Sequence, residues 1–166
     1  MEKIAVIGAG TMGSGIAHVF AQKGFDVILI DTQATALEKA MASIEKNLDR
    51  QIAKGTIFSE DKKATLLRIS TAMSIETGVI NADLVVEAAT ENSPLKKSIF
   101  KAIDQFAKQN CIIASNTSSI SITELAAATQ RPGKVIGMHF MNPVPIMKLV
   151  EIINGTSTET IVTEKI

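Results

Sequence analysis

His139 and Glu151 are the residues of this chain whose types and spacing best suit proton transfer. Period-two alternation along a predicted strand places Glu151 on the same side as Leu149 and Ile153, and an unpaired carboxylate on such an apolar side is costly. His139 lies across a short connection and is expected to be its partner. A carboxylate bonded to one imidazole nitrogen leaves the other free to take a proton, as the oxidation of an alcohol requires. A structural pair, or a Glu151 exposed on an edge strand, is the alternative that spacing leaves open.

A glycine pattern near the N-terminus is suited to binding a dinucleotide. Gly8, Gly10 and Gly13 have the G-x-G-x-x-G spacing, directly after an apolar run and at the start of a predicted helix. The first glycine allows a tight turn, the second lets a pyrophosphate approach the backbone, and the third lets the helix pack against the sheet. Free N–H groups at the helix start face the phosphates, so Thr11 and Met12 are also expected to bind the cofactor. A glycine-rich turn without a ligand is the alternative.

Asp31 indicates which dinucleotide is bound. It stands at the end of the second predicted strand, 23 residues after Gly8. A carboxylate there accepts hydrogen bonds from the adenosine ribose hydroxyls and repels a 2′-phosphate. No arginine occurs between Asp31 and Leu48 to bind such a phosphate. The sequence therefore predicts NAD rather than NADP.

Apolar runs alternate with helical patterns, which predicts an α/β fold of the doubly wound Rossmann type. The sheet is expected to be mostly parallel, with helices on both faces and the final strand or strands antiparallel. Ser59, Ser93 and Ser121 are predicted to cap three of the helices, with Glu124 completing a capping box. The predicted strands are 4–7, 25–30, 69–72, 83–88, 111–114, 134–138 and 147–153, and the predicted helices are 11–23, 34–54, 59–67, 93–106 and 121–128.

Length and composition restrict the class of protein. The 166 residues suit one domain or a piece of a larger protein. Residues 1–156 are predicted to form an NAD-binding domain, and residues 157–166 to begin a helix leading to a C-terminal helical domain. Equal numbers of acidic and basic residues and the absence of Tyr and Trp argue against a nucleic acid partner.

No apolar run approaches the length of a membrane span, and no signal peptide precedes the first strand. The single cysteine, Cys111, is interpreted as a structural thiol in a reducing cytoplasm. No cluster of His, Cys, Asp or Glu has metal-ligand spacing, so no metal is predicted.

Two segments resemble the 3-hydroxyacyl-CoA dehydrogenase family, most closely its bacterial members that act on 3-hydroxybutyryl-CoA. They are residues 114–119, Ala-Ser-Asn-Thr-Ser-Ser, and residues 137–151, which begin Gly-Met-His-Phe-Met-Asn-Pro. The resemblance implies that His139 is the catalytic base and Glu151 its orienting partner. It further implies that Ser118 bonds the substrate's 3-oxygen and Asn142 helps position the reacting end. The family also uses a second asparagine, from its helical C-terminal domain, that this chain does not contain.

The same resemblance assigns residues to the cofactor and to coenzyme A. Residues 86–92, Val-Glu-Ala-Ala-Thr-Glu-Asn, resemble a family segment, which implies that Glu91 and Lys96 contact NAD. A polar loop followed by a solvated lysine is the alternative. Arg50 and Lys54 match positions where the family binds the 3′-phosphate end of coenzyme A.

Lys46, Arg50 and Lys54 follow one another at helical spacing and form a basic stripe, which suits an anionic ligand. The alternative is that these side chains complement the helix dipole or pair with Glu45 and Asp49 nearby.

The predicted function is NAD-dependent interconversion of (S)-3-hydroxyacyl-CoA and 3-oxoacyl-CoA. The resemblance also implies that the full-length parent protein is a homodimer. One alternative is an NAD-binding module without turnover. Another is a two-domain dehydrogenase of the 6-phosphogluconate or 3-hydroxyisobutyrate type, which usually carries a lysine acid/base on its helical domain. His18 is expected on a helix surface, and Met138, Met141 and Met147 line an acyl pocket or simply fill the core.

Overall fold

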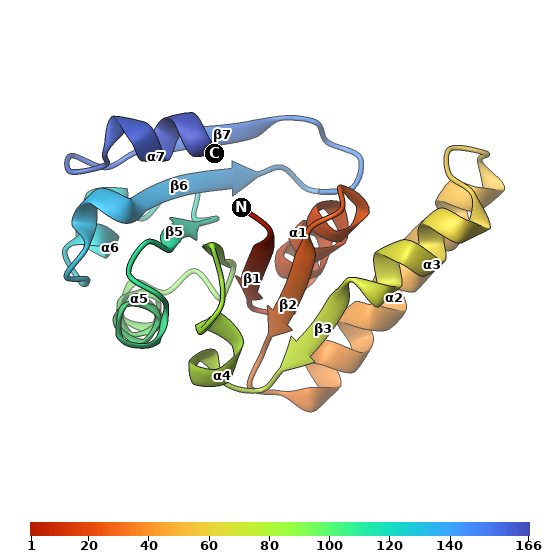
Figure 1. The fold of residues 1–166 in the computed structure, drawn as a ribbon, viewed down its shortest axis with the longest axis horizontal. Helices are drawn as coiled ribbons and strands as arrows, with labels where there is room; N and C mark the ends of the chain where they lie inside the picture. The colour runs from red at the N-terminus through yellow and green to blue at the C-terminus, as the bar shows by residue number, and fades with distance from the viewer.

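The computed structural model describes residues 1–166 and contains one seven-stranded sheet in the order β3-β2-β1-β4-β5-β6-β7 (Figure 1). The first six strands are parallel, and only β7 runs antiparallel to its neighbour β6. This confirms the predicted fold class. The strands are β1 Lys3–Ile7, β2 Asp26–Ile30, β3 Ile69–Ala72, β4 Leu84–Glu87, β5 Ile112–Ser115, β6 Val135–Phe140 and β7 Val150–Asn154.

Helices cover both faces of the sheet. Side chains of β1 alternate between two cores: Ile4 and Val6 pack with α1, α2 and α7, and Ala5 and Ile7 pack with α4, α5 and α6. The helices are α1 Thr11–Gln22, α2 Ala34–Ala53, α3 Ser59–Leu67, α4 Ile75–Val79, α5 Ser93–Phe106, α6 Ile122–Ala126 and α7 Thr160–Lys165, with a 3-10 turn at Pro132–Lys134.

The strand order reverses direction between β1 and β4, because β2 and β3 extend the sheet to one side and β5 to β7 extend it to the other (Figure 1). Loops leaving the carboxyl ends of β1 and β4 therefore diverge and open a crevice. In open α/β sheets this is where ligands bind. All of the predicted cofactor and catalytic residues lie on loops, strands or helix starts near this edge, whereas Arg50 and Lys54, predicted for coenzyme A, lie at the far end of α2.

In two helices the serine predicted as the cap is instead the first helical residue, so the prediction lies one residue too far along the chain. Asn92, not Ser93, caps α5: its Oδ1 accepts the Leu95 N–H at 2.9 Å. Ser59 is the first residue of α3, and the Asp61 carboxylate accepts the N–H of the residue before it at 2.8 Å. Ser121 caps α6 as predicted, through its hydroxyl and the N–H three residues on, but the predicted capping box is wrong, because the Glu124 carboxylate pairs with Lys97 at 3.2 Å.

The seventh strand is shorter than predicted. It begins at Val150 rather than at 147, since residues 141–149 form a loop in which Val144 packs against α1. The Cβ that Gly15 lacks would come within 2.8 Å of the Val144 Cβ. The short helix α4 was not predicted at all, because its five residues carry no helical repeat.

His18 is buried, so its predicted place on the surface of α1 is wrong. α1 packs against the sheet on one side and against α2 and α3 on the other, which leaves it little exposed surface. Burial of the His18 ring lowers its pKa to about 4.

Cys111 is fully buried, and burial raises the pKa of its thiol to about 12. The thiol is therefore protonated and unreactive at neutral pH, as expected of a structural cysteine.

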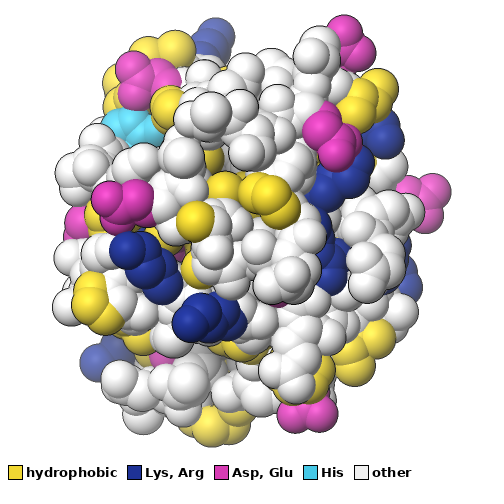
Figure 2. Space-filling view, turned by 90° about the vertical axis from the view of Figure 1, so that its left-hand side faces the viewer, with side chains coloured by type: hydrophobic (Ala, Val, Ile, Leu, Met, Phe, Trp, Pro, Cys, Tyr) yellow, Lys and Arg dark blue, Asp and Glu magenta, His cyan; other side chains and the backbone are white.

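None of the helices combines the length and the apolar character that crossing a lipid bilayer demands. Figure 2 shows basic and acidic side chains interspersed on one face of the molecule, without a broad area of a single charge.

Candidate functional site

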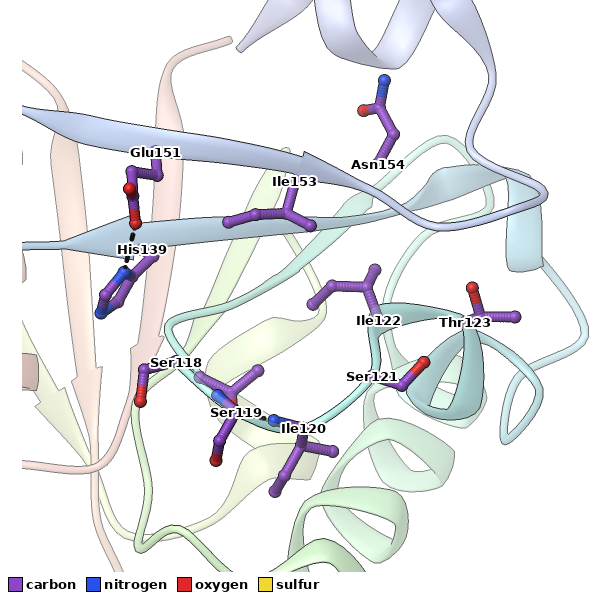
Figure 3. A pocket seen from close by; sticks show the side chains of 11 residues that line it. Ser118, Ser119, Ile120, Ser121, Ile122, Thr123, His139, Glu151, Ile153 and Asn154 are labelled. Atoms are coloured by element: carbon purple, nitrogen blue, oxygen red, sulfur yellow. Dashed lines mark hydrogen bonds and ion pairs between the residues drawn. The ribbon is translucent and has the colours of Figure 1, made fainter.

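His139 and Glu151 are brought together by strand register. They are directly opposite in the antiparallel pairing of β6 and β7, and His139 Nδ1 lies 2.8 Å from Glu151 Oε2 (Figure 3). The Glu151 side chain is 52% exposed, so the argument that an apolar face forces the pair is wrong. Residues directly opposite each other on neighbouring strands are in contact because of the strand register, whether or not their surroundings are apolar. The pair exists, and its catalytic role stays a prediction.

A cavity of about 310 Å³ opens beside this pair. In Figure 3 the second ring nitrogen of His139 is turned away from Glu151, toward the end of the cavity where Ser118 lies. A hydroxyl and an imidazole nitrogen at one end of a cavity are suited to hold a substrate oxygen between them. The lining residues are Thr117 to Thr123, His139, Glu151, Ile153 and Asn154.

The loop that carries Ser118 is held at both of its ends. Asn116 Oδ1 accepts the Phe140 N–H at 2.9 Å and so ties this loop to the end of β6, next to His139. Thr117 Oγ1 accepts the N–H groups of Ser119 and Ile120 at 3.3 and 3.0 Å, which folds the loop into a tight turn. Ser118 thus has a defined position relative to His139 before any ligand binds.

Asn142 lies just beyond β6, exposed, and its side chain bonds to no other residue of the chain. It follows His139 closely but is not among the residues that line the cavity. Its predicted role therefore stays a prediction.

The glycine loop has the shape that a dinucleotide pyrophosphate requires. Gly8 adopts φ +99°, and a Cβ there would come within 2.6 Å of the Ala88 carbonyl oxygen. A Cβ on Gly13 would overlap the Gly8 carbonyl oxygen, so only glycine lets α1 approach β1 this closely. Gly10 has no atom within 4 Å of the missing Cβ, which leaves open space at the start of α1. The N–H groups of Thr11 and Met12, in the first turn, have no carbonyl partner and are free for phosphate oxygens.

Asp31 lies at the rim of a larger cleft of about 680 Å³ that also includes the glycine loop and Ala88. Its Oδ2 accepts the Ala9 N–H at 2.8 Å, and its Oδ1 accepts the Gln33 N–H at 3.0 Å. Each carboxylate oxygen keeps a further lone pair, so both ribose hydroxyls can still bind. Asp31 therefore also holds the glycine loop in place, which its spacing did not reveal.

Lys96 is not a solvated helix lysine, since its side chain is only 1% exposed. Its Nζ lies 2.7 Å from Oε1 of Glu87, a residue to which sequence reasoning gave no role. Glu87 is fully buried at the end of β4 and pairs in register with Ser115 of β5, whose hydroxyl it accepts at 2.6 Å. A charged residue ending an otherwise apolar strand was the signal that could have revealed Glu87.

Glu91 lies between the cleft that Asp31 borders and the cavity beside His139. Its Oε1 accepts hydrogen bonds from the hydroxyls of Thr117 and Ser119, and its Oε2 lies 3.4 Å from Lys96 Nζ. Partial burial raises the pKa of Glu91, but these hydroxyls and the ammonium outweigh it and hold the pKa below its usual value. Glu91 is therefore a carboxylate at neutral pH.

The basic side chains of α2 do not pair with the acids beside them. Glu45 and Asp49 instead bind Lys62 of α3, at 3.1 and 2.6 Å, so the predicted pairing is wrong, while the interaction with the helix dipole stays open because Arg50 lies in the last turn. Arg50 has one side-chain hydrogen bond, to Asn47 at 3.3 Å, and Lys54 at the helix end has none. Both cations lie on the exposed surface of α2 and remain available to an anion.

Known proteins resemble this chain along its whole length. The family model described as "3-hydroxyacyl-CoA dehydrogenase, NAD binding domain" matches residues 3–166. A 3-hydroxybutyryl-CoA dehydrogenase of Bradyrhizobium diazoefficiens is 50% identical over 159 residues, 96% of this chain and 54% of that protein. The mitochondrial hydroxyacyl-coenzyme A dehydrogenase of Homo sapiens is 44% identical over 165 residues, 95% of this chain and 52% of that protein.

Solved structures agree with this similarity. The (S)-3-hydroxybutyryl-CoA dehydrogenase of Ralstonia eutropha has a TM-score of 0.96 at 45% identity, covering 99% of this chain and 58% of that one. The chain therefore spans about half the length of the curated relatives that it matches.

Proposed function

Because the chain belongs to the 3-hydroxyacyl-CoA dehydrogenase family, we propose that it is the NAD-binding part of an enzyme that interconverts (S)-3-hydroxybutyryl-CoA and acetoacetyl-CoA. The observation that carries the proposal is the contact of His139 with Glu151 at the carboxyl edge of the sheet, in a cavity that Ser118 also lines. The relatives' names supply the substrate class, and this contact supplies a group able to exchange the hydroxyl proton.

The proposed proton transfer takes place at His139. Its free ring nitrogen accepts the proton of the substrate 3-hydroxyl, and returns it in the reducing direction. Glu151 fixes the tautomer and stabilises the imidazolium that forms. Ser118 bonds the same substrate oxygen, and Asn142 positions the reacting end. NAD, when held by these residues, would supply the acceptor for the hydride of C3 of the substrate.

The residues present fit that cofactor. The open space beside Gly10 and the free N–H groups that follow it suit the pyrophosphate, and Asp31 suits the adenosine ribose. Arg50 and Lys54 are proposed to bind the 3′-phosphate end of coenzyme A. Their exposure and their lack of acidic partners support this assignment.

We further propose that residues 1–156 are the NAD-binding domain, followed in the complete protein by a helical domain through which two copies associate. The relatives' greater length supports this proposal. A reducing cytoplasm is the proposed compartment, and no nucleic acid or membrane partner is proposed.

A module that binds NAD without turnover is the second candidate, favoured by the glycine loop and Asp31, which form a dinucleotide site independently of His139 and Glu151. The family match gives no support to an enzyme of the 6-phosphogluconate or 3-hydroxyisobutyrate type.

The test measures NADH oxidation with acetoacetyl-CoA and with free acetoacetate, by this chain alone and with the relatives' helical region appended. Turnover of the thioester, absent with the free acid, would support the proposal. NADH binding without turnover in either form would favour the binding module. Preference for the free acid would contradict the proposed substrate class.

A further inference from the structure

The second half of α2 carries acidic and basic side chains on neighbouring parts of its surface. Each residue of a helix is turned by about 100° from the one before it, so Glu45 and Asp49, four residues apart, lie side by side. Arg50 lies about 100° further round the helix than Asp49, and Lys54 continues the basic stripe at the helix end. Two carboxylates therefore lie beside the cations that we assign to coenzyme A.

Lys62 of α3 binds both of these carboxylates. In Figure 1 α2 and α3 run side by side at one edge of the molecule. Lys62 Nζ lies 3.1 Å from Glu45 Oε1 and 2.6 Å from Asp49 Oδ1, so one ammonium bridges successive turns of α2. Hydrogen bonds to Asp49 and then to Glu45 raise the pKa of Lys62, so the bridge is charged at neutral pH. Both acids are thereby held on the side of α2 that faces α3.

Stability alone is a weak reason for this bridge. The side chains of Glu45 and Asp49 are 56% and 57% exposed, and solvent screens an ion pair at such a surface. Without Lys62, the Asp49 carboxylate would be free to turn to Lys46, three residues earlier on the same helix. Lys46 belongs to the basic stripe, so a carboxylate there would repel an incoming phosphate.

We propose that Lys62 is a positioning residue for the 3′-phosphate end of coenzyme A, because it holds Glu45 and Asp49 against α3 and keeps the basic stripe of α2 free for that phosphate. Lys62 acts through the two acids and does not itself touch the ligand. The inference rests on the proposed function, in which Arg50 and Lys54 bind coenzyme A. It confines the effect of Lys62 to ligands that carry the 3′-phosphate.

The test compares CoA with dephospho-CoA, which lacks only the 3′-phosphate, by titration calorimetry on the chain and on Lys62→Gln. At an ionic strength of about 20 mM we expect CoA affinity to fall about threefold, the effect of one unneutralised carboxylate near a phosphate dianion in water. Dephospho-CoA affinity should stay within about 1.5-fold, because the repelled group is absent. In about 0.5 M salt the difference should disappear, since salt screens the repulsion but does not repair a damaged fold.

Two further variants serve as controls. Lys62→Arg keeps the charge and should retain most of the CoA affinity. Lys97→Gln is the matched control for the loss of one lysine, because Lys97 forms an exposed pair with Glu124 of α6 at 3.2 Å, away from α2. It should change neither affinity.

A double variant separates action through the acids from direct contact with the phosphate. Adding Asp49→Asn to Lys62→Gln removes the freed charge and should restore most of the CoA affinity. In the unaltered chain Asp49→Asn should change that affinity by less than about 1.5-fold, because Lys62 already neutralises the carboxylate. Equal gains in the two backgrounds would overturn the inference by making the charges act independently.

Unchanged CoA affinity in Lys62→Gln, or an equal loss of affinity for CoA and dephospho-CoA, would also overturn it. Equal binding of the two ligands by the unaltered chain would refute the assignment of Arg50 and Lys54, and the inference with it. NADH is titrated alongside and should bind every variant equally. Failure of the unaltered chain to bind NADH would refute the proposed function instead.

Discussion

At the scale of single residues, the contact between His139 and Glu151 separates proton transfer from cofactor binding. In Glu151→Gln the imidazole keeps a hydrogen-bond partner at 2.8 Å but loses the negative charge that stabilises the imidazolium. We expect turnover of acetoacetyl-CoA to fall by roughly 10²-fold or more, as for other disabled acid/base groups. NADH affinity should be retained, because Glu151 lies outside the cofactor cleft. The measurement is steady-state kinetics beside an NADH titration, in a form of the protein that turns over.

The control is Glu164→Gln, an exposed glutamate on α7 without an ion pair. Normal turnover in Glu151→Gln would remove this residue from the mechanism. A fall in NADH affinity as large as the fall in turnover would indicate a displaced β7 instead.

His18 should make folding stability depend on pH. Burial lowers its pKa from 6.5 to about 4. Between these two pH values the His18 imidazole is protonated in the unfolded chain and neutral in the folded chain. Stability then falls as the pH drops from 6.5 to 4, by about 3 kcal/mol in total. Urea unfolding at several pH values measures this slope, and His18→Leu should reduce it, because leucine does not titrate.

The chain has one other histidine, His139, which serves as the control. His139→Gln should retain the acid-induced loss of stability. If the free energy of unfolding depends on pH equally in His18→Leu and in the unaltered chain, then burial does not lower the pKa of His18.

The residue types of the candidate site could be predicted, and several of their surroundings could not. Motif spacing led to Gly8, Asp31 and His139, since each follows a strand at the edge where ligands bind. The burial of His18 depends on which helices cover α1. The burial of Lys96 depends on the carboxylate of Glu87 at the end of β4. A single helix pattern does not contain that information.

At the scale of elements, two glycines of one turn are expected to respond in opposite ways to the same substitution. Gly13→Ala should gain about 1 kcal/mol of helix propensity, but its Cβ overlaps the Gly8 carbonyl oxygen, and we expect a net loss of about 2 kcal/mol. Gly10→Ala meets nothing within 4 Å, so stability should change by only a few tenths of a kcal/mol. Its methyl group enters the space proposed for the pyrophosphate, and NADH affinity should fall.

Thermal melting and an NADH titration of both variants measure these effects, each variant serving as the other's control. A stable Gly13→Ala would contradict the close packing of α1 on β1. Unchanged NADH affinity in Gly10→Ala would contradict the proposed place of the pyrophosphate.

Element boundaries were predictable where a local signal marks them. Gly24 and Gly55, at φ +95° and +69°, follow α1 and α2, where the sequence places the ends of these helices. The start of β7 was mistaken, since an apolar run containing Met147 and Leu149 resembles a strand. Pairing with β6 decides the boundary, and pairing is a property of two segments rather than of one.

At the scale of the whole molecule, the order of the strands would make a bound cofactor a link between two halves of the sheet. The adenosine site that we propose lies with β1 and β2, and the cavity with Ser118 and His139 lies with β5 to β7. A ligand that binds only the folded chain stabilises it by about 2.7 kcal/mol at 100 times its Kd. For a chain of this size that is a rise in Tm of roughly 5–10 °C, which we expect for NADH.

NADPH should give a much smaller shift at the same concentration. Its 2′-phosphate would meet the Asp31 carboxylate, which already holds the Ala9 N–H at 2.8 Å and cannot move aside without releasing the glycine loop. Differential scanning calorimetry with each nucleotide measures the two shifts, and Asp31→Asn, which removes the repelling charge, should bring them closer together. Equal shifts in the unaltered chain would contradict the assignment of NAD as the cofactor. A shift with neither nucleotide would show that the crevice between β1 and β4 is no dinucleotide site.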